Sequence, residues 1–224
     1  MKQSPNFTAM NERPEIPDSL IQQQFKRKLP IVEPRVDVIV INSRGFSNPE
    51  WVKKCFNSIK SQSYSKIGII TAGNFGRKYT IGQCWNAAIA RSSAKYVMFV
   101  GDDDMIAPTL IHTLVNAIKQ ARQLDSEVVG VSSFMTMMDA DEKYLGLMPN
   151  PFTGLFDREY LSRNRFDESL KNNVDTELLN RYNAAGKRIA KVSHYYGYFY
   201  RRHKDMVSGE ERFIKPKKAD AKLG

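Results

Sequence analysis

Three consecutive carboxylates, Asp102, Asp103 and Asp104, follow Gly101 and the apolar run at residues 96–100. In an open α/β sheet, ligands bind in the crevice outside the carboxyl ends of the strands, so these side chains are expected at such a crevice. Adjacent carboxylates repel one another unless a cation neutralises them, and Mg²⁺ or Mn²⁺ takes oxygen ligands while leaving positions open for phosphate. The triplet therefore predicts a metal-diphosphate site. The competing interpretation is an acidic cap on the following helix.

The elements that would position this triplet alternate between strand and helix. Runs of β-branched residues predict buried strands, and apolar residues at helical spacing predict helices between them. The expected strands are residues 36–41, 67–71, 96–100 and 127–131, and the expected helices are one opened by Pro49, one at 81–92 and one from Pro108 to Leu124. This alternation predicts an α/β fold with a mostly parallel central sheet and helices on both faces.

The second half of the chain has a weaker pattern. The segment after Met135 is expected to be loop-rich up to a helix at residues 175–185, which Gly186 would end. A final aromatic-rich strand at residues 195–200 runs into Arg201, Arg202 and His203. The arginines have the geometry to pair with phosphate, although a solvated basic patch has the same composition.

Length and composition favour a single folded domain. The chain has 224 residues, of which 42% are hydrophobic and 26% are charged, as in ordinary globular proteins. The five prolines within residues 1–34 indicate that this segment is an N-terminal arm, with one short helix at 18–28. The domain is expected at residues 35–208, and residues 209–224 form a basic C-terminal tail. The two cysteines lie in helical apolar patterns and are expected to be reduced core residues.

The net charge of +10 is concentrated near the C-terminus, where residues 187–224 carry 11 Lys and Arg against 4 Asp and Glu. A basic face attracts polyanions such as nucleic acid, an anionic membrane or an acidic polysaccharide, although a solubilising tail has the same composition. No apolar run approaches the roughly 18 residues that a membrane-spanning helix needs, and the N-terminus does not have the pattern of a secretory signal. We therefore expect a cytoplasmic protein without a transmembrane segment, for which peripheral membrane contact stays open.

Several of these motifs, taken in order, resemble the family 2 glycosyltransferases, which have the Rossmann-like GT-A fold and use nucleotide-sugar donors. The resemblance covers most of residues 36–208. It consists of a first strand ending in a polar turn, an Asn-containing helix, an Asp-rich strand end followed by a proline, and a later segment with a catalytic carboxylate. In chain order, the first three features are Val38 to Arg44, Cys84 to Ala90 around Asn86, and Gly101 to Pro108. The later segment consists of Arg165 to Leu170 and Val174 to Gly186.

The resemblance implies a metal-dependent, inverting transfer of a sugar from a nucleotide diphosphate to an acceptor hydroxyl. It implies that Asp102, Asp104 and His203 hold Mn²⁺ or Mg²⁺, and that Asp175 is the catalytic base. A base of this kind must reach the acceptor hydroxyl, whereas a purely structural Asp175 would cap its helix. The residues expected to bind the nucleotide sugar are Ser43, Arg44, Asn74, Arg77, Asn86, Asp102, Asp103 and Arg202.

The chain departs from the family pattern at three places. Gly101 stands where the first Asp of the acidic motif is usual. Thr71 to Asn74 replace the Asp residues that commonly hold the base after the second strand, and Val174 replaces the Glu of a Glu-Asp pair. These differences leave open a nucleotide- or polyanion-binding module without turnover.

Two acceptors are compatible with the sequence. The resemblance favours a glycan or a lipid-linked glycan. The basic C-terminal region also allows a modified base in viral DNA, because a basic groove could hold a phosphate backbone.

Overall fold

The computed structural model describes residues 33–42 and 48–203. Ser43, Arg44, the helix expected at residues 18–28 and the tail at 209–224 lie outside the described residues. Within the described part of the chain, no helix is both long and apolar enough to cross a membrane. Cys55 and Cys84 are free and buried, as their apolar helical patterns predict.

The first half of the chain forms the predicted parallel strands. β1 (Val36–Asn42) pairs in parallel with β2 (Ile67–Gly73) on one side and β3 (Tyr96–Gly101) on the other. α2 (Pro49–Lys60) and α3 (Ile81–Arg91) lie between these strands in the sequence. Ile41 of β1 is in register with Ala72 of β2 and with Gly101 of β3, so the three carboxyl ends are level at one edge of the sheet.

The second half completes a mixed sheet. Its elements are β4 (Met105–Ile106), α4 (Leu110–Leu124), β5 (Val128–Met138), β6 (Tyr144–Asp157), α5 (Arg158–Arg163), α6 (Val174–Ala184), β7 (Arg188–Lys191) and β8 (Tyr198–Arg201). The strand order is β2-β1-β3-β6-β5-β8-β4, with β7 paired to β5. The β3–β6, β5–β6 and β4–β8 pairs are antiparallel, whereas β7 and β8 run parallel to β5.

The prediction of a loop-rich segment after Met135 is wrong. β5 continues to Met138, and β6 returns beside it to form a long hairpin. The sequence hides β6 because Pro149 and Pro151 are disfavoured within strands, and because its first half is largely exposed and so shows no buried apolar run. The hairpin register shifts between Ser132 and Phe134, which also interrupts the alternation of side chains.

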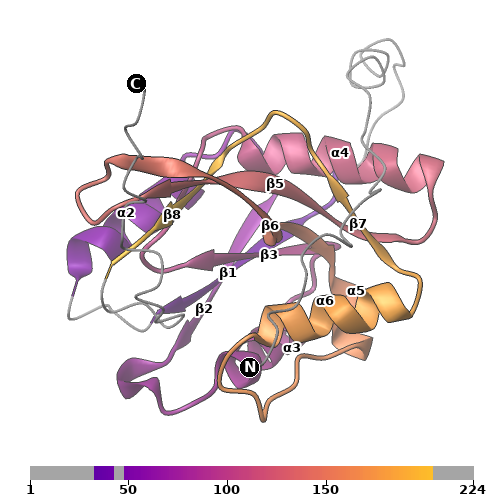
Figure 1. The fold of residues 1–224 in the computed structure, drawn as a ribbon, viewed down its shortest axis with the longest axis horizontal. Helices are drawn as coiled ribbons and strands as arrows, with labels where there is room; N and C mark the ends of the chain where they lie inside the picture. The colour runs from indigo at the N-terminus through magenta and orange to yellow at the C-terminus, as the bar shows by residue number, and fades with distance from the viewer. Residues whose placement is uncertain (1–32, 43–47, 204–224) are drawn as a thin grey trace, which may run out of the picture.

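Helices cover both faces of the sheet, as predicted (Figure 1). On one face, α2 and α4 pack over a core that includes Val38, Met98 and Leu114. On the other face, α3, α5 and α6 pack over a core that includes Phe99 and Leu178. With two packed faces, the sheet exposes its edges and strand ends, so the carboxyl ends of β1, β2 and β3 are where polar side chains can gather.

Candidate active site

The acidic triplet forms a tight loop between β3 and β4 at the carboxyl edge of the sheet. Asp102, Asp103 and Asp104 are all buried, with 1%, 8% and 3% of their surface exposed. A buried carboxylate is stable only if hydrogen bonds or cations compensate for its lost hydration. The partners of each carboxylate therefore indicate what the loop can bind.

Asp104 is bonded to the neighbouring strand. Its Oδ2 accepts a hydrogen bond from the Tyr198 hydroxyl at 2.7 Å, and its Oδ1 accepts one from the backbone N–H of Arg201 at 2.9 Å. Burial, followed by the charge of Asp104, raises the pKa of Tyr198 well above its ordinary value, so this hydroxyl stays a donor. Asp104 thus ties the acidic loop to β8, although the sequence predicted it to be a metal ligand.

Asp103 contacts His203 across 100 residues of sequence. The Oδ2 of Asp103 lies 2.7 Å from the Nε2 of His203, just beyond the end of β8. The Trp51 ring, from the first turn of α2, packs on the imidazole with ring centroids 4.8 Å apart. The fold therefore brings Asp103, which was predicted to bind the nucleotide sugar, against His203, the one histidine predicted for the metal site. Packing on Trp51 fixes the imidazole.

Arg201, the last residue of β8, fixes the position of the acidic loop. Its side chain is fully buried, and its Nε donates to the backbone carbonyl of Asp103 at 2.9 Å. The same guanidinium donates to the carbonyl of Ala140 and pairs with Glu142 at 3.1 Å, which joins the turn of the β5–β6 hairpin to the loop. The guanidinium also lies 5.0 Å from the Trp51 ring. These roles of Trp51, Glu142 and Arg201 carry no local sequence signal.

Glu142 links α2 to this assembly as well. Lys54 of α2 forms a hydrogen-bonded ion pair with Glu142. This hydrogen bond lowers the pKa of the Glu142 carboxyl below its ordinary value, although burial acts in the opposite direction. Arg201 lowers the same pKa further. Glu142 therefore stays ionised at neutral pH and compensates for the buried charge of Arg201.

Gly101 has a structural reason to be glycine. A Cβ at this position would lie 2.7 Å from the Oδ2 of Asp104 and 2.8 Å from the Oδ1 of Asp103. Two carboxylates thus fold back over the position at which the family pattern in the sequence resemblance has an Asp. Burial first, and then the charges of Asp104, Asp102 and Asp103, raise the pKa of the nearby Cys55 thiol, so this thiol stays protonated.

The described residues fit an ion that is shared with a phosphate ligand. No group of three or more His, Cys, Asp or Glu side chains within residues 33–42 and 48–203 could hold a metal by itself. Mg²⁺ and related ions that bind nucleotides usually need only one or two protein ligands, because phosphate oxygens and water supply the others. Asp103 and His203 lie close enough together to act as such a pair.

The predicted nucleotide contacts at Asn74 and Arg77 lie in a short loop after β2. The Asn74 side chain is buried, and its amide bonds to both backbone groups of Tyr79 within the loop. Arg77 ends the short helix η3 (Phe75–Arg77), is exposed, and has a positive φ of 51°. The loop therefore lies at the expected sheet edge, but its asparagine points inward.

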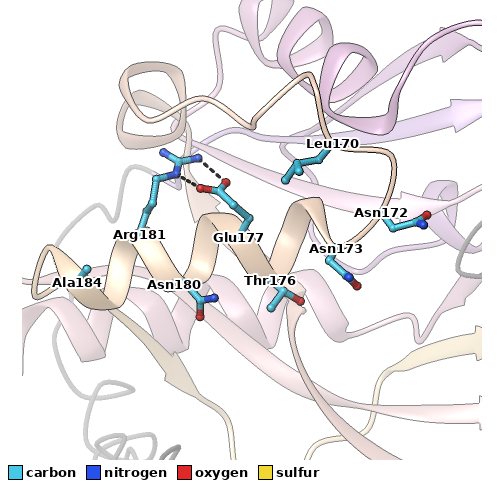
Figure 2. A pocket seen from close by; sticks show the side chains of 8 residues that line it. All are labelled: Leu170, Asn172, Asn173, Thr176, Glu177, Asn180, Arg181 and Ala184. Atoms are coloured by element: carbon cyan, nitrogen blue, oxygen red, sulfur yellow. Dashed lines mark hydrogen bonds and ion pairs between the residues drawn. The ribbon is translucent and has the colours of Figure 1, made fainter. Parts of the chain in front are cut away.

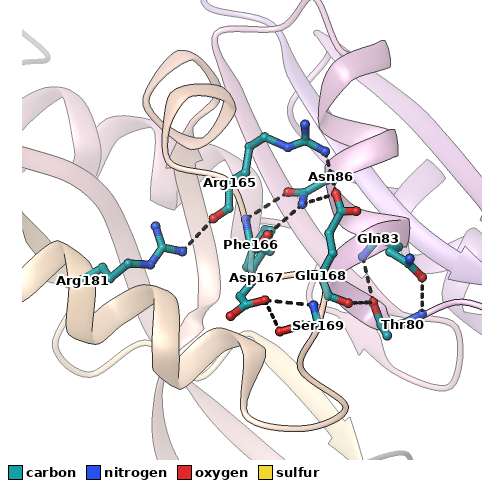
Figure 3. A network of polar contacts seen from close by, with 9 residues as sticks. All are labelled: Thr80, Gln83, Asn86, Arg165, Phe166, Asp167, Glu168, Ser169 and Arg181. Carbon is teal, nitrogen blue, oxygen red and sulfur yellow. Dashed lines mark hydrogen bonds and ion pairs between the residues drawn. The ribbon is translucent and has the colours of Figure 1, made fainter.

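Asn86 also bonds within the protein (Figure 3). Its amide group donates to the carbonyl of Phe166 and to Glu168, both at 2.9 Å, and its Oδ1 accepts the N–H of Phe166 at 3.0 Å. Thr80, the N-cap of α3, donates to the carbonyl of Glu168 at 3.0 Å. These contacts anchor the segment that precedes α6 to the start of α3, close to the carboxyl end of β2.

We expect Asn86→Ala to lower the free energy of unfolding by about 2–3 kcal/mol, because it leaves the buried N–H and C=O groups of Phe166 without their partner. Urea denaturation measures this effect. Gln83→Ala is the matched control, since it removes only the reciprocal half of the Thr80 capping box and should cost about 1 kcal/mol or less. An Asn86 variant as stable as the control would show that the anchor contributes little.

Asp175 lies in the first turn of α6 and is partly buried. Successive helical residues are turned by about 100°, so Asp175 heads the same stripe as Leu178, Leu179 and Tyr182, which are buried against the sheet. Its Oδ1 accepts the N–H of Thr176 at 2.9 Å. The N-cap position belongs to Asn173, so Asp175 is not the helix cap that the alternative interpretation required.

The opposite side of α6 borders an open depression of about 560 Å³ (Figure 2). Asparagines, a threonine and the Glu177–Arg181 ion pair contribute most of its wall, which consists of Leu170, Asn172, Asn173, Thr176, Glu177, Asn180, Arg181 and Ala184. None of the residues that the sequence predicted for the site is among them. We therefore place the candidate active site at the acidic loop and not in this depression.

The structure thus groups some predicted residues and separates others. Asp102, Asp103, Asp104 and His203 gather at the ends of β3 and β8. Arg202 lies between β8 and His203, and its N–H donates to the carbonyl of Met138. Asn74 and Arg77 lie two strands away, and Asn86 lies within α3. That Asp175, Ser43 and Arg44 belong to the same site stays a prediction. Ser43 and Arg44 lie outside the described residues.

The fold is that of the GT-A-type glycosyltransferases, because the solved structures that match it share this architecture. They include TarS from S. aureus, matched at a TM-score of 0.56 and 15% identity over 76% of this chain and 37% of the TarS chain. Residues 1–349 of TarS with UDP-GlcNAc match at a TM-score of 0.58 and 15% identity, over 78% of this chain and 60% of the other. The same fragment with UDP matches at a TM-score of 0.56 and 16% identity, over 76% and 61%. The chain therefore spans less than two thirds of these neighbours.

Comparison by sequence adds no closer relative. No protein-family model matches the chain, and no curated protein matches it either. The structural likeness at this identity supports the fold, and the function has to be argued from the site.

Proposed function

We propose that this protein is a glycosyltransferase that moves a sugar from a nucleotide-diphosphate donor to an acceptor hydroxyl, with Mn²⁺ or Mg²⁺ as cofactor and inversion at the sugar. The observation that carries the proposal is the buried acidic loop at the carboxyl end of β3, where Asp103 meets His203 at 2.7 Å. The fold supports it, because neighbouring structures with this fold have been solved with UDP and with UDP-GlcNAc. A uridine donor is the first to test.

In this proposal Asp103 and His203 hold the ion beside the donor diphosphate. The ion supplies Lewis-acid stabilisation of the negative charge that develops on the departing diphosphate. Asp104 and Arg201 stabilise the loop. The Asp104 carboxylate accepts hydrogen bonds from the Tyr198 hydroxyl and the Arg201 N–H, and the Arg201 guanidinium donates to the carbonyl of Asp103. They keep the loop in one conformation, so little reorganisation is needed during the reaction.

Asp175 is the residue that we propose to remove the proton from the acceptor hydroxyl. An acceptor oxygen attacks the sugar carbon from the face opposite the departing diphosphate, and its proton passes to a carboxylate on that side. The anchor through Asn86 and Thr80 holds the segment before α6 at the start of α3. This supports an approach of Asp175 to the donor from the carboxyl edge of the sheet.

The acceptor that we propose is a glycan or a lipid-linked glycan, in line with the sequence resemblance.

The proposed function is tested by incubating the protein with nucleotide sugars, UDP-GlcNAc first, together with glycan acceptors or with water as the only acceptor, and following the release of the nucleoside diphosphate. We expect release with Mn²⁺ or Mg²⁺ and at least about 100-fold less with EDTA. Thermal shifts with the same donors report binding without turnover, because a ligand that binds the native state stabilises it. Binding of donors without any release would support an inactive module, and neither binding nor release would contradict the proposal.

A further inference from the structure

The depression beside α6 is lined mainly by uncharged polar side chains that are exposed. They are Asn172, Asn173, Thr176 and Asn180. Its volume of about 560 Å³ lies within the usual range of ligand-binding pockets. The acidic loop carries three carboxylates, so the two places suit ligands of different chemistry. The depression is therefore a second candidate binding site of this chain.

Three of these side chains form a row along the helix (Figure 2). Asn173, Thr176 and Asn180 are three and four residues apart, which places them on one side of α6. Neighbours in such a row have Cβ atoms about 5–6 Å apart. From Asn173 to Ala184 the depression follows the helix for about 16 Å, at the helical rise of 1.5 Å per residue. An open depression of this length suits an extended chain of small polar units better than one compact molecule.

The segment before α6, which forms the rest of the wall, is held in place before any ligand binds (Figure 3). The Nη2 of Arg181 donates to the carbonyl of Arg165 at 2.7 Å, which joins the helix to the start of this segment. Asn86 and Thr80 anchor the same segment to α3. The wall is therefore preformed, and a ligand loses little free energy in ordering it.

The donors and acceptors along the depression indicate the class of ligand. An asparagine amide and a threonine hydroxyl each donate and accept hydrogen bonds, so they match ligand hydroxyl groups, which do both as well. Glu177 and Arg181 bond to each other, with Oε2 and Nη2 3.0 Å apart, so their charges compensate. Leu170 and Ala184 add apolar surface. A neutral saccharide fits this combination, because it has hydroxyls around its ring and C–H groups on its faces.

We propose that the depression binds a neutral glycan chain, and that this chain is the acceptor, whose reacting end passes around the start of α6 to Asp175. Thr176 lines the depression and directly follows Asp175 in the first turn of the helix. This inference rests on the proposed function, since it assumes transfer to a glycan, and it narrows the acceptor to a chain of several sugar units. Contacts far from the reacting hydroxyl act equally on the bound substrate and on the transition state, so they lower KM without changing kcat.

The test is an NMR titration of the isotope-labelled protein, without donor, with maltotriose, cellotriose and triacetylchitotriose. Glucose and N-acetylglucosamine are the probes with a single unit. We expect at least one trisaccharide to shift the side-chain amide signals of Asn173 and Asn180 and to bind at least about 10-fold more tightly than its single unit. Thr176→Ala and Asn180→Ala should each weaken this binding by roughly 5- to 10-fold, as for the loss of one hydrogen bond. In the transfer assay both variants should raise the KM for the glycan at unchanged kcat.

Asn183→Ala is the matched control, because Asn183 is an exposed asparagine of the same helix that does not line the depression. It should bind every saccharide as the wild-type protein does. If no trisaccharide shifted the two amide signals, or if Thr176→Ala and Asn180→Ala bound as tightly as the control, the glycan site would be overturned, while release of nucleoside diphosphate from the donor would still support the proposed function. Trisaccharide binding by a protein that released no nucleoside diphosphate from any donor would overturn the proposed function and the acceptor role together.

Discussion

Asp103→Asn is expected to lower the rate of sugar transfer by at least about 100-fold while the protein stays folded. The substitution removes one negative charge from the loop that we propose to hold the ion and the diphosphate, where charge stabilisation has its largest effect. Asparagine keeps the shape of the side chain and can still bond to the Nε2 of His203, so the packing of the loop is preserved. Steady-state kinetics at saturating Mn²⁺ and donor measure the effect, and circular dichroism monitors the fold.

The matched control for Asp103→Asn is Asp125→Asn. Asp125 is a partly buried carboxylate paired with Arg188 at 3.1 Å, and it lies between α4 and β5. Its neutralisation should leave the rate of transfer within about 2-fold of the wild type, because it contacts none of the proposed machinery. If Asp103→Asn kept more than a third of the activity, Asp103 would have no part in binding the ion.

Asp175→Asn should lower kcat by about 10²- to 10⁴-fold and leave the affinity for the donor unchanged. An amide can replace the carboxylate as acceptor of the Thr176 N–H, so the start of α6 should survive, but an amide cannot take up the acceptor proton. Single-turnover kinetics, with donor affinity measured separately by calorimetry, distinguish the chemical step from binding.

Glu177→Gln is a close control for Asp175→Asn, because both residues lie in the first turn of α6. Glu177 pairs with Arg181 on the side of the depression, whereas Asp175 heads the buried stripe. A loss of activity in Glu177→Gln that equalled the loss in Asp175→Asn would assign the effect to the helix as a whole and would contradict a specific role for Asp175.

The elements that the sequence predicted best are those with a strong local pattern. The buried β1, with the helices and strands after it, has the periodicity of a β-α-β-α-β unit, so β2, β1 and β3 follow from local hydrophobic patterns. β6 was missed because two prolines and an exposed first half conceal it. β6 lies between β3 and β5 in the sheet, which leaves the other edge of β5 to pair with β8. Because β5 and β8 are far apart in the sequence, no short stretch of sequence predicts their pairing.

The acidic loop itself was predictable, but the role of each carboxylate was not. A triplet after a buried strand indicates where the site lies, because strand ends meet at one sheet edge. Whether Asp103 or Asp104 faces a ligand depends on Tyr198 and Arg201, which arrive from β8 almost 100 residues later. Asn74 was expected to bind the nucleotide because it follows the second strand, and Asn86 because the family resemblance implies it. The hydrogen bonds that both amides make within the protein depend on residues outside their own local patterns.

The central claim is that Asp103 and His203 together hold a divalent ion beside the donor diphosphate. Pulsed electron paramagnetic resonance of Mn²⁺ bound in the presence of UDP tests it most directly, because a coordinated imidazole gives a nitrogen coupling. We predict nitrogen coupling in the wild-type protein, its loss in His203→Gln, and weakened Mn²⁺ binding in Asp103→Asn. A spectrum without nitrogen coupling in the wild-type protein, or Mn²⁺ binding unchanged by both substitutions, would contradict the account.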